Sequence, residues 1–394
     1  MNRNIEIDRL RALAVIATVY AHLPDLWLWK VPIIEFLRRY IAGYDGVLLF
    51  FTISGFVISA SLIPKLDSAL NTGNGTIRVL TAFFCKRLYR ITPTASLWII
   101  ITLCIAYIVD PSNLKGNIYA AFAALFNYFN IYTATPDTLP NTYGVYWSLS
   151  LEEQFYVALP IVLICFRTSM SRIIALMSLV ILTEFGAPIL GVMFQIPPIV
   201  GGVALYIIDE KFNIIKRISD SCLSSRLILI PLASLLTVSI FTLPLIRPFT
   251  PHYVLIMGAV CTLFVCIAAV GKNSVLPIKG GSAIMDWLGS RSFTLYLTHL
   301  PMILLVRYCW MHVAPRVGIE YSQEHTLAIF TTWILTTLLV TEFSYRFFEK
   351  PLMQRGRRIA NRVESGSTKL PWIKNINTKI LAKHEPLTKE NIKG

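Results

Sequence analysis

The sequence contains few charged residues for its length. Of its 394 residues, only 15% are Asp, Glu, Lys or Arg, whereas an ordinary soluble domain carries about 25%. Hydrophobic residues make up 55%, and the mean hydropathy is +0.60. This composition excludes an ordinary soluble enzyme, a disordered chain and a collagen-like chain.

The sequence also lacks the cysteine spacing of a disulfide framework or a zinc site. Its seven cysteines show no paired spacing, and most of them lie in or beside apolar stretches, where Cys packs as a small hydrophobic residue. We therefore expect no bound metal. No small-residue cleavage site follows the first apolar stretch, so we expect that stretch to be a retained first helix and not a signal peptide.

Apolar stretches of roughly sixteen to twenty residues recur along the chain, and a bilayer core of about 30 Å requires spans of that length. We predict an all-α fold: a polytopic integral membrane helical bundle with about 10 transmembrane helices. The predicted spans are residues 10–28, 43–63, 91–109, 151–166, 172–190, 193–208, 226–246, 253–271, 291–310 and 325–345.

The net charge of +14 would suggest nucleic acid as a partner of a soluble protein. Here most of the cations flank apolar spans, as in cytoplasmic loops of membrane proteins, so we expect membrane lipids and no nucleic acid as their partners. With ten crossings, both termini and most basic loops lie on the cytoplasmic side. We therefore predict one membrane-embedded domain over residues 1–351 and a basic cytoplasmic tail over residues 352–394.

A further apolar piece, residues 117–133, is interrupted by three Asn and is rich in aromatic residues. Counting it as an eleventh crossing would place either the basic N-terminus or the basic tail outside, against the positive-inside rule. We therefore predict that it is a re-entrant or interfacial segment.

The first predicted helix carries two ionisable residues on one face. Arg11 and His22 are eleven positions apart, which is within roughly 20° of three full turns and about 16 Å along the axis. Ionisable groups inside a membrane domain are costly and usually face a cavity. Taken separately, Arg11 is also compatible with a headgroup anchor and His22 with a hydrogen bond to a neighbouring helix.

Two further segments carry small or basic residues at regular spacing. In DGVLLFFTISGFVIS, Gly46 and Gly55 favour close helix packing over the lining of a channel. In FFCKRLYRITP, Arg87 and Arg90 stand about one turn apart, an arrangement that suits a phosphate but also serves as a cytoplasmic anchor.

Two carboxylates stand at the head of an apolar span in YGVYWSLSLEEQFYVALP. Glu152 and Glu153 are compatible with acidic residues in the first turn of a helix that Ser148 or Ser150 caps. Capping accounts for only one of the two Glu. It leaves the polar, aromatic-rich entrance of the segment unexplained, and that composition is typical of a site that binds a sugar or orients a hydroxyl.

The candidate substrate-binding residues are Trp147, Ser148, Tyr156 and His299. The first three belong to the aromatic-rich entrance around Glu152. His299 lies in the later apolar segment LGSRSFTLYLTHLP, where helix packing is an equally good explanation for a histidine.

Six segments in a fixed order carry a family resemblance: LRALAVIATVYAH, FFTISGF, KRLYR, WSLSLEEQFY, LGSRSFTLYLTHLP and SYRFFEKP. Together they resemble acyltransferase family 3, the O-antigen acetylase-like membrane O-acyltransferases, from about Ile5 to Pro351. The resemblance implies a multi-pass enzyme of the bacterial inner membrane. Such an enzyme transfers an acyl group, typically acetyl, from cytoplasmic acyl-CoA to a hydroxyl of a cell-surface carbohydrate such as O-antigen, exopolysaccharide or a glycolipid.

The positions that match the family's motif residues are Arg11, His22, Arg87, Arg90, Trp147, Ser148 and Glu152. The resemblance implies that His22 is catalytic, and we predict that it is the general base, because the unperturbed pKa of histidine suits proton transfer near neutral pH. Glu152 is predicted to orient His22 or the acceptor hydroxyl. The three arginines are predicted to hold the phosphates of CoA, which is a co-substrate and not a bound cofactor.

The chain departs from the family pattern at two places. Arg9 stands where relatives usually have Gly, so the surroundings of Arg11 stay open. Many relatives carry a C-terminal SGNH-type domain, whereas this chain has about forty polar residues there, and we expect it to act alone or with a separate periplasmic partner. The competing interpretations are a transporter or flippase of a sugar-linked or anionic lipid that uses the same charges, and a catalytically silent sensor.

Overall fold

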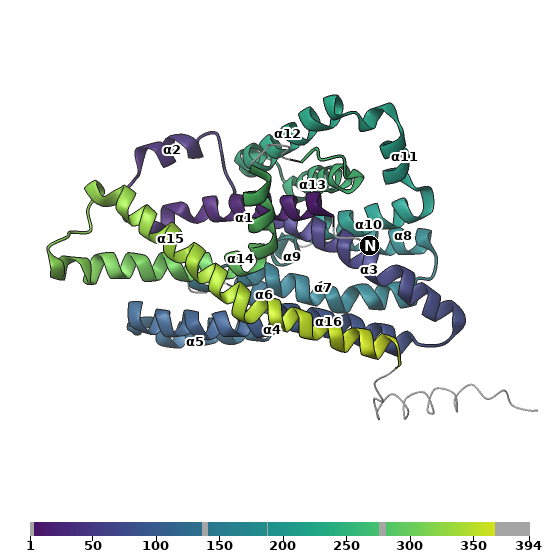
Figure 1. Cartoon of the computed structure of the whole chain (residues 1–394), viewed down its shortest axis with the longest axis horizontal. Helices are drawn as coiled ribbons and strands as arrows, with labels where there is room; N and C mark the ends of the chain where they lie inside the picture. The colour runs from purple at the N-terminus through teal and green to yellow at the C-terminus, as the bar shows by residue number, and fades with distance from the viewer. Residues whose placement is uncertain (1–3, 136–140, 187, 276–280, 367–394) are drawn as a thin grey trace, which may run out of the picture.

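The computed structural model describes residues 4–135, 141–186, 188–275 and 281–366, and these residues contain helices and no strand. Most of the long helices run along the long axis of the molecule (Figure 1). Each predicted span falls on one of the helices α1 (Ile5–His22), α3 (Gly46–Thr72), α4 (Thr76–Val109), α7 (Tyr146–Cys165), α8 (Ser169–Phe185), α10 (Ile196–Phe212), α12 (Arg226–Thr242), α13 (Tyr253–Val270), α14 (Gly281–His312) and α15 (Thr326–Ser344). The predicted all-α helical bundle is confirmed.

Six helical segments in the described part of the chain are long and apolar enough to cross a membrane. They are Gly46–Thr72, Thr76–Val109, Tyr146–Cys165, Arg226–Phe249, Tyr253–Val270 and Gln323–Glu364. Helices α8 and α10 have 17 residues each, and α1 carries two acidic residues and two arginines within its 18. Crossing by these three helices and by α14 therefore stays a prediction.

The segment predicted to be re-entrant forms two short helices, α5 (Leu114–Leu125) and α6 (Phe129–Tyr132). The 12 residues of α5 span about 18 Å, well short of a bilayer core. Asn127 turns the chain between them with φ 56°, a conformation that Asn tolerates better than most residues. Helix α5 packs beside α4 (Figure 1), an arrangement that agrees with a segment that enters the membrane and turns back.

Glycines hold α1 close to its neighbours. A Cβ on Gly46 of α3 would lie 2.3 Å from a carbonyl oxygen of α1, and one on Gly289 of α14 would lie 2.0 Å from another. A Cβ on Gly55 of α3 would lie 2.1 Å from the carbonyl oxygen of Ile199 in α10. Because only glycine permits this approach, the predicted packing role of Gly46 and Gly55 is confirmed, and α1 is fixed between α3 and α14.

The structure extends the packed domain beyond residue 351, where the sequence predicted a tail. A π-helical turn (Tyr345–Glu349) joins α15 to α16 (Lys350–Glu364), which packs on α4. The Glu364 carboxylate accepts hydrogen bonds from Lys65 (2.7 Å) and Lys86 (3.0 Å). The strong amphipathicity of α16 explains the difference, since its apolar side is covered by α4. Residues 367–394 of the predicted tail lie outside the described residues.

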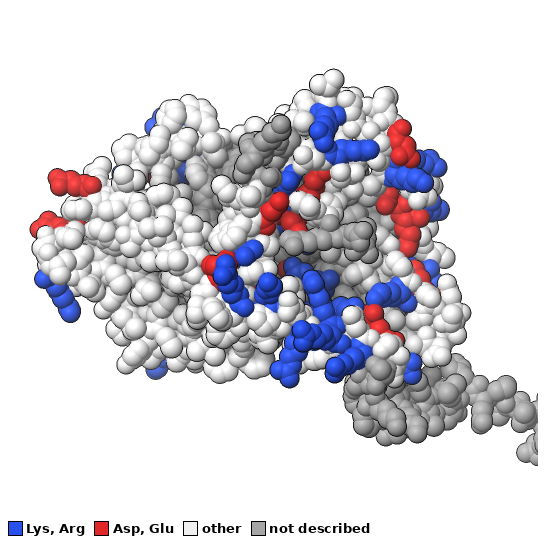
Figure 2. All heavy atoms as spheres, in the orientation of Figure 1, with Lys and Arg blue, Asp and Glu red and all other residues white. Residues whose placement is uncertain are grey.

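Charged side chains are unevenly distributed over the molecule. On the face in Figure 2, Lys and Arg gather over the half that contains α16, whereas the other half is largely uncharged. We call the first the basic end, and we call the end where α1 finishes the His22 end. Helix α1 therefore runs from one end towards the other, and its residues Arg11 and His22 lie at different depths.

Candidate active site

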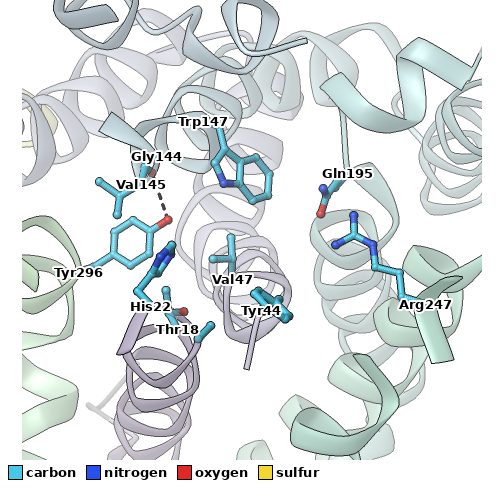
Figure 3. A pocket seen from close by; sticks show the side chains of 11 residues that line it. Thr18, His22, Tyr44, Val47, Gly144, Val145, Trp147, Gln195, Arg247 and Tyr296 are labelled. Atoms are coloured by element: carbon cyan, nitrogen blue, oxygen red, sulfur yellow. Dashed lines mark hydrogen bonds between the residues drawn. The ribbon is translucent and has the colours of Figure 1, made fainter. Parts of the chain in front are cut away.

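His22 is the last residue of α1 and lines a cavity of about 280 Å³, which we call the His22 cavity. Trp147, Gln195, Arg247 and Tyr296 also line it. In Figure 3 the His22 ring points towards Tyr296, while Arg247 extends from the far wall beside Gln195. Among the described lining residues Arg247 is the only Lys, Arg, Asp or Glu, so the cavity carries a positive charge next to a base.

A carboxylate contacts the imidazole of His22. The short helix η1 (Leu23–Leu26) follows α1 directly and places Asp25 three residues beyond His22, with 3.2 Å between Nδ1 and Oδ2. An ionised carboxylate only accepts hydrogen bonds, so the proton of neutral His22 belongs on Nδ1. Nε2 then carries the free lone pair, which is the arrangement required of a general base.

His299 lies beside His22 and does not line the cavity. The ring centroids of the two histidines are 5.4 Å apart, and His299 is fully buried. Its Nδ1 lies 3.2 Å from the carbonyl oxygen of Leu295, which can only accept, so Nδ1 donates. Its Nε2 has no hydrogen-bond partner among the described residues. In this geometry the His299 ring lies beside the His22 ring and outside the cavity predicted to hold the acceptor.

The aromatic-rich entrance of α7 contributes to the His22 cavity in a different way from the prediction. Trp147 lines the cavity, whereas Ser148 is buried and hydrogen-bonds the hydroxyl of Tyr296 at 2.7 Å. Helix α7 begins at Tyr146 and has no side-chain cap. Ser150 instead accepts a hydrogen bond from the backbone of Phe129. The capping explanation was therefore wrong, because the helix starts earlier than the two serines require.

A second cavity, which we call the arginine cavity, lies between α1, α3, α4 and α7 and has a volume of about 40 Å³. Its polar lining residues are Arg11, Ser54, Arg87, Arg90, Glu152 and Tyr156. The structure thus brings together the three arginines that the sequence grouped. The Arg87 guanidinium lies 5.4 Å from the Tyr156 ring centroid, and its buried Nε has no hydrogen-bond partner among the described residues. Arg11 is held by Asp8 at 2.6 Å.

The position of Glu152 differs from the prediction that it orients His22. Its carboxylate accepts hydrogen bonds from Ser54 and Tyr156, inside the arginine cavity. Asp25 takes the place beside the imidazole instead. The reason is the helical register of α7, which puts Trp147 at one cavity and Glu152 at the other. Tyr156 follows Glu152 and likewise lies away from the His22 cavity.

Sequence reasoning missed three residues of the His22 cavity and its surroundings. Asp25 could have been found from the sequence, because HLPD places a carboxylate three residues after His22. Arg247 and Tyr296 could not be found in this way, because they reach the cavity from η5 (Leu243–Phe249) and α14, which are far from His22 in the sequence. No group of three or more His, Cys, Asp or Glu side chains in the described ranges could hold a metal ion.

These features define a class of protein: a helical membrane bundle with a histidine–carboxylate pair at one end of a central helix and an arginine cluster nearer the other. Residues 4–344 match the family described as an acyltransferase domain. The chain belongs to this acyltransferase family, as the six sequence segments indicated. No solved structure matches the chain.

Curated relatives are bacterial O-acetyltransferases. The chain is 25% identical over 376 residues to peptidoglycan O-acetyltransferase OatA of Listeria monocytogenes, covering 89% of this chain and 56% of the relative. It is 25% identical over 392 residues to the putative peptidoglycan O-acetyltransferase YrhL of Bacillus subtilis (90% and 56%). It is 26% identical over 381 residues to O-acetyltransferase OatA of Staphylococcus aureus (89% and 57%). The chain thus spans little more than half the length of these relatives.

Proposed function

We propose that this protein is a membrane O-acyltransferase that moves an acyl group from acyl-CoA to a hydroxyl of a cell-surface carbohydrate, with His22 as the general base. The observation that carries the proposal is the placement of two complementary sites along one helix. Arg11 lies in a cavity with two further arginines, and His22 lies in another cavity with a carboxylate on its Nδ1.

The arginine cavity suits the phosphates of the donor. Guanidinium groups bind phosphate oxygens through paired hydrogen bonds, and Arg87 has an unsatisfied buried Nε. A volume of about 40 Å³ is far smaller than CoA, so the arginines would hold one phosphate group while the rest of the nucleotide lies outside. From Arg11 to His22 the helix rises about 16 Å, a distance that the pantetheine arm would bridge to bring the thioester to the base.

The chemistry at His22 balances without further groups. Nε2 takes the proton of the acceptor hydroxyl while the hydroxyl oxygen attacks the thioester carbonyl carbon. The tetrahedral intermediate collapses, the carbon–sulfur bond breaks, and the CoA thiolate receives the proton back from the imidazolium. Asp25 stabilises the imidazolium that forms between the two steps, because its carboxylate accepts the Nδ1 hydrogen bond.

Charge distribution supports an orientation for this reaction. Lys and Arg gather at the basic end (Figure 2), and basic segments of inner-membrane proteins stay in the cytoplasm. In this orientation both termini are cytoplasmic, the arginine cavity receives acyl-CoA from the cytoplasm, and the His22 cavity lies towards the periplasmic or outer face, where surface carbohydrates are available.

The names of the relatives indicate which acceptor to test first. Two of them are named peptidoglycan O-acetyltransferases, so a cell-wall glycan is a more direct candidate than the O-antigen suggested by the sequence motifs. A separate periplasmic partner is a further part of the proposal.

Radiolabelled acetyl-CoA, detergent-purified protein and a glycan acceptor test the proposal. We expect label in the glycan with wild-type protein and none with His22→Ala, whose equal yield in the membrane fraction shows that it inserts. Reconstitution in vesicles separates the transporter alternative, in which labelled glycolipid crosses the membrane unmodified. Such transport without covalent transfer would overturn the proposal, and the absence of both activities would favour the sensor.

A further inference from the structure

A third cavity lies close to the His22–Asp25 pair, and neither donor binding nor the base requires it. Its volume is about 280 Å³, equal to that of the His22 cavity. We call it the Asp110 cavity. Its polar lining residues are Asp25, Asp110, Asn113, Asn117, Thr142 and Arg307, and its apolar ones come from α4 and α14.

The Asp110 cavity and the His22 cavity are lined by nearby residues of the same parts of the chain. Asp25 contacts His22 with its carboxylate and also lines the Asp110 cavity. On α14, Tyr296 lines one cavity and Leu300 the other, about 6 Å further along the helix. In the segment before α7, Thr142 lines the Asp110 cavity, and Gly144 and Val145 line the His22 cavity. A ligand in the Asp110 cavity is therefore a close neighbour of a hydroxyl held at His22.

The chemistry of the lining selects a neutral, hydroxyl-rich ligand. Asp25 and Asp110 provide two carboxylates against the single guanidinium of Arg307, which disfavours phosphates and other anions. Asn113 and Asn117 add amide groups that both donate and accept. The apolar side chains from α4 and α14 suit the flat carbon–hydrogen face of a pyranose ring, while the polar lining residues suit its hydroxyls.

Two polar side chains in this cavity retain bonding capacity. Asn117 is 8% exposed and donates from its amide nitrogen to the carbonyl of Asn113 at 3.1 Å, and no hydrogen bond to its amide oxygen occurs among the described residues. Arg307 donates from one nitrogen to the backbone oxygen of Asp25 at 3.0 Å. Both side chains line the cavity, so a ligand with hydroxyls in it can accept from Arg307 and donate to the Asn117 amide oxygen.

We propose that the Asp110 cavity binds a second sugar unit of the acceptor, so that the enzyme acts on oligosaccharides that occupy both cavities and not on single sugars. This inference rests on the proposed function. It adds that the acceptor is a chain of at least two sugar units, that the acylated unit lies at His22, and that the neighbouring unit lies between Asp110 and Arg307.

N-acetylglucosamine oligomers of one to five units, with radiolabelled acetyl-CoA as donor, test the inference. For wild-type protein we expect kcat/KM to rise at least about tenfold from one unit to two or three, the effect of one or two hydrogen bonds to charged or buried groups. Asn117→Leu, which keeps the side-chain size, and Asp110→Asn should each reduce this ratio towards one. Glu320→Gln is the matched control: it neutralises an exposed carboxylate in the loop after α14, and the ratio should stay at the wild-type value.

The outcomes separate the two proposals. Transfer with equal kcat/KM for all lengths would overturn the second sugar site and leave the proposed function intact. No transfer to any oligomer would overturn the proposed function for this glycan, and equilibrium binding of the same series then decides the second site. Affinity that rises with length and loses this dependence in Asn117→Leu supports the site, whereas affinity independent of length contradicts it. Monodisperse elution of each variant confirms that it is folded.

Discussion

Replacement of Asp25 by Asn should slow acyl transfer while leaving acyl-CoA binding unchanged. The Asp25 carboxylate lies 3.2 Å from Nδ1 of His22, and in the proposed mechanism it keeps the proton on that nitrogen. Asn has the same size, but its amide can donate to Nδ1. The imidazole would then carry its proton on Nε2 and lose the lone pair that accepts the hydroxyl proton.

The expected magnitude follows from the geometry. A hydrogen bond to a charged group contributes about 1.5 to 3 kcal/mol, and each 1.4 kcal/mol is about tenfold in rate. Because the Asp25 side chain is 42% exposed, solvent weakens the interaction, and we expect the lower part of this range, a fall in kcat of about 10- to 30-fold.

The assay is acyl transfer at saturating acetyl-CoA, with Glu35→Gln as the matched control. Glu35 lies in α2 (Pro32–Arg38), its side chain is 43% exposed, and it does not line the His22 cavity. The control should retain the wild-type kcat. If Asp25→Asn stays within about twofold of wild type, or if it lowers kcat no more than the control does, the assignment of Asp25 as the partner of His22 is refuted.

Variants at three further positions test the donor site and the helix packing. Arg11→Lys should insert normally but bind acetyl-CoA more weakly in a calorimetric titration, and Arg11→Ala should lose about 1.5 to 3 kcal/mol of binding free energy; equal affinities would reduce Arg11 to an anchor. Glu152→Gln should change the KM for acetyl-CoA and not that for the glycan, because Glu152 lies in the arginine cavity; the reverse result would contradict this placement. Gly55→Ala should lower the free energy of unfolding by about 1 to 3 kcal/mol, since its Cβ would meet the Ile199 carbonyl at 2.1 Å. Thermal melting in detergent measures this, with Ser61→Ala in the same helix as the control, and equal melting of the two variants would count against close packing of α3 and α10.

Much of the fold could be predicted from the sequence, because the bilayer imposes a length on every apolar span. Each of the ten predicted spans falls on a helix, including α12 and α13, which contain no charged residue after Arg226. The predicted ends of the spans were less accurate where a helix continues beyond its apolar part into polar residues. Helix α4 starts at Thr76 and runs through Pro93, although the predicted span began at residue 91, because the basic segment before the proline lies outside the apolar window.

The candidate site could be predicted only where one helix carries several of its residues. Arg87 and Arg90 lie about one turn apart on α4 and line the same cavity, so helical periodicity grouped these two. Arg11 and His22, grouped in the same way, line separate cavities. Which partner each group meets depends on tertiary packing. Glu152 was assigned to His22, but the rotation of α7 turns it towards the arginines, and residue spacing within one helix contains no information about such a rotation.

In the proposed mechanism His22 supplies the base for acyl transfer at a site separate from the arginines that bind acyl-CoA. The most direct test compares wild type and His22→Ala in two measurements on the same detergent-purified samples: equilibrium binding of acetyl-CoA and transfer of label to a cell-wall glycan. We expect equal binding and at least about a hundredfold loss of transfer, the effect of removing a general base. Transfer within about twofold of wild type would contradict the claim, and loss of acetyl-CoA binding together with transfer would contradict the separation of the two sites.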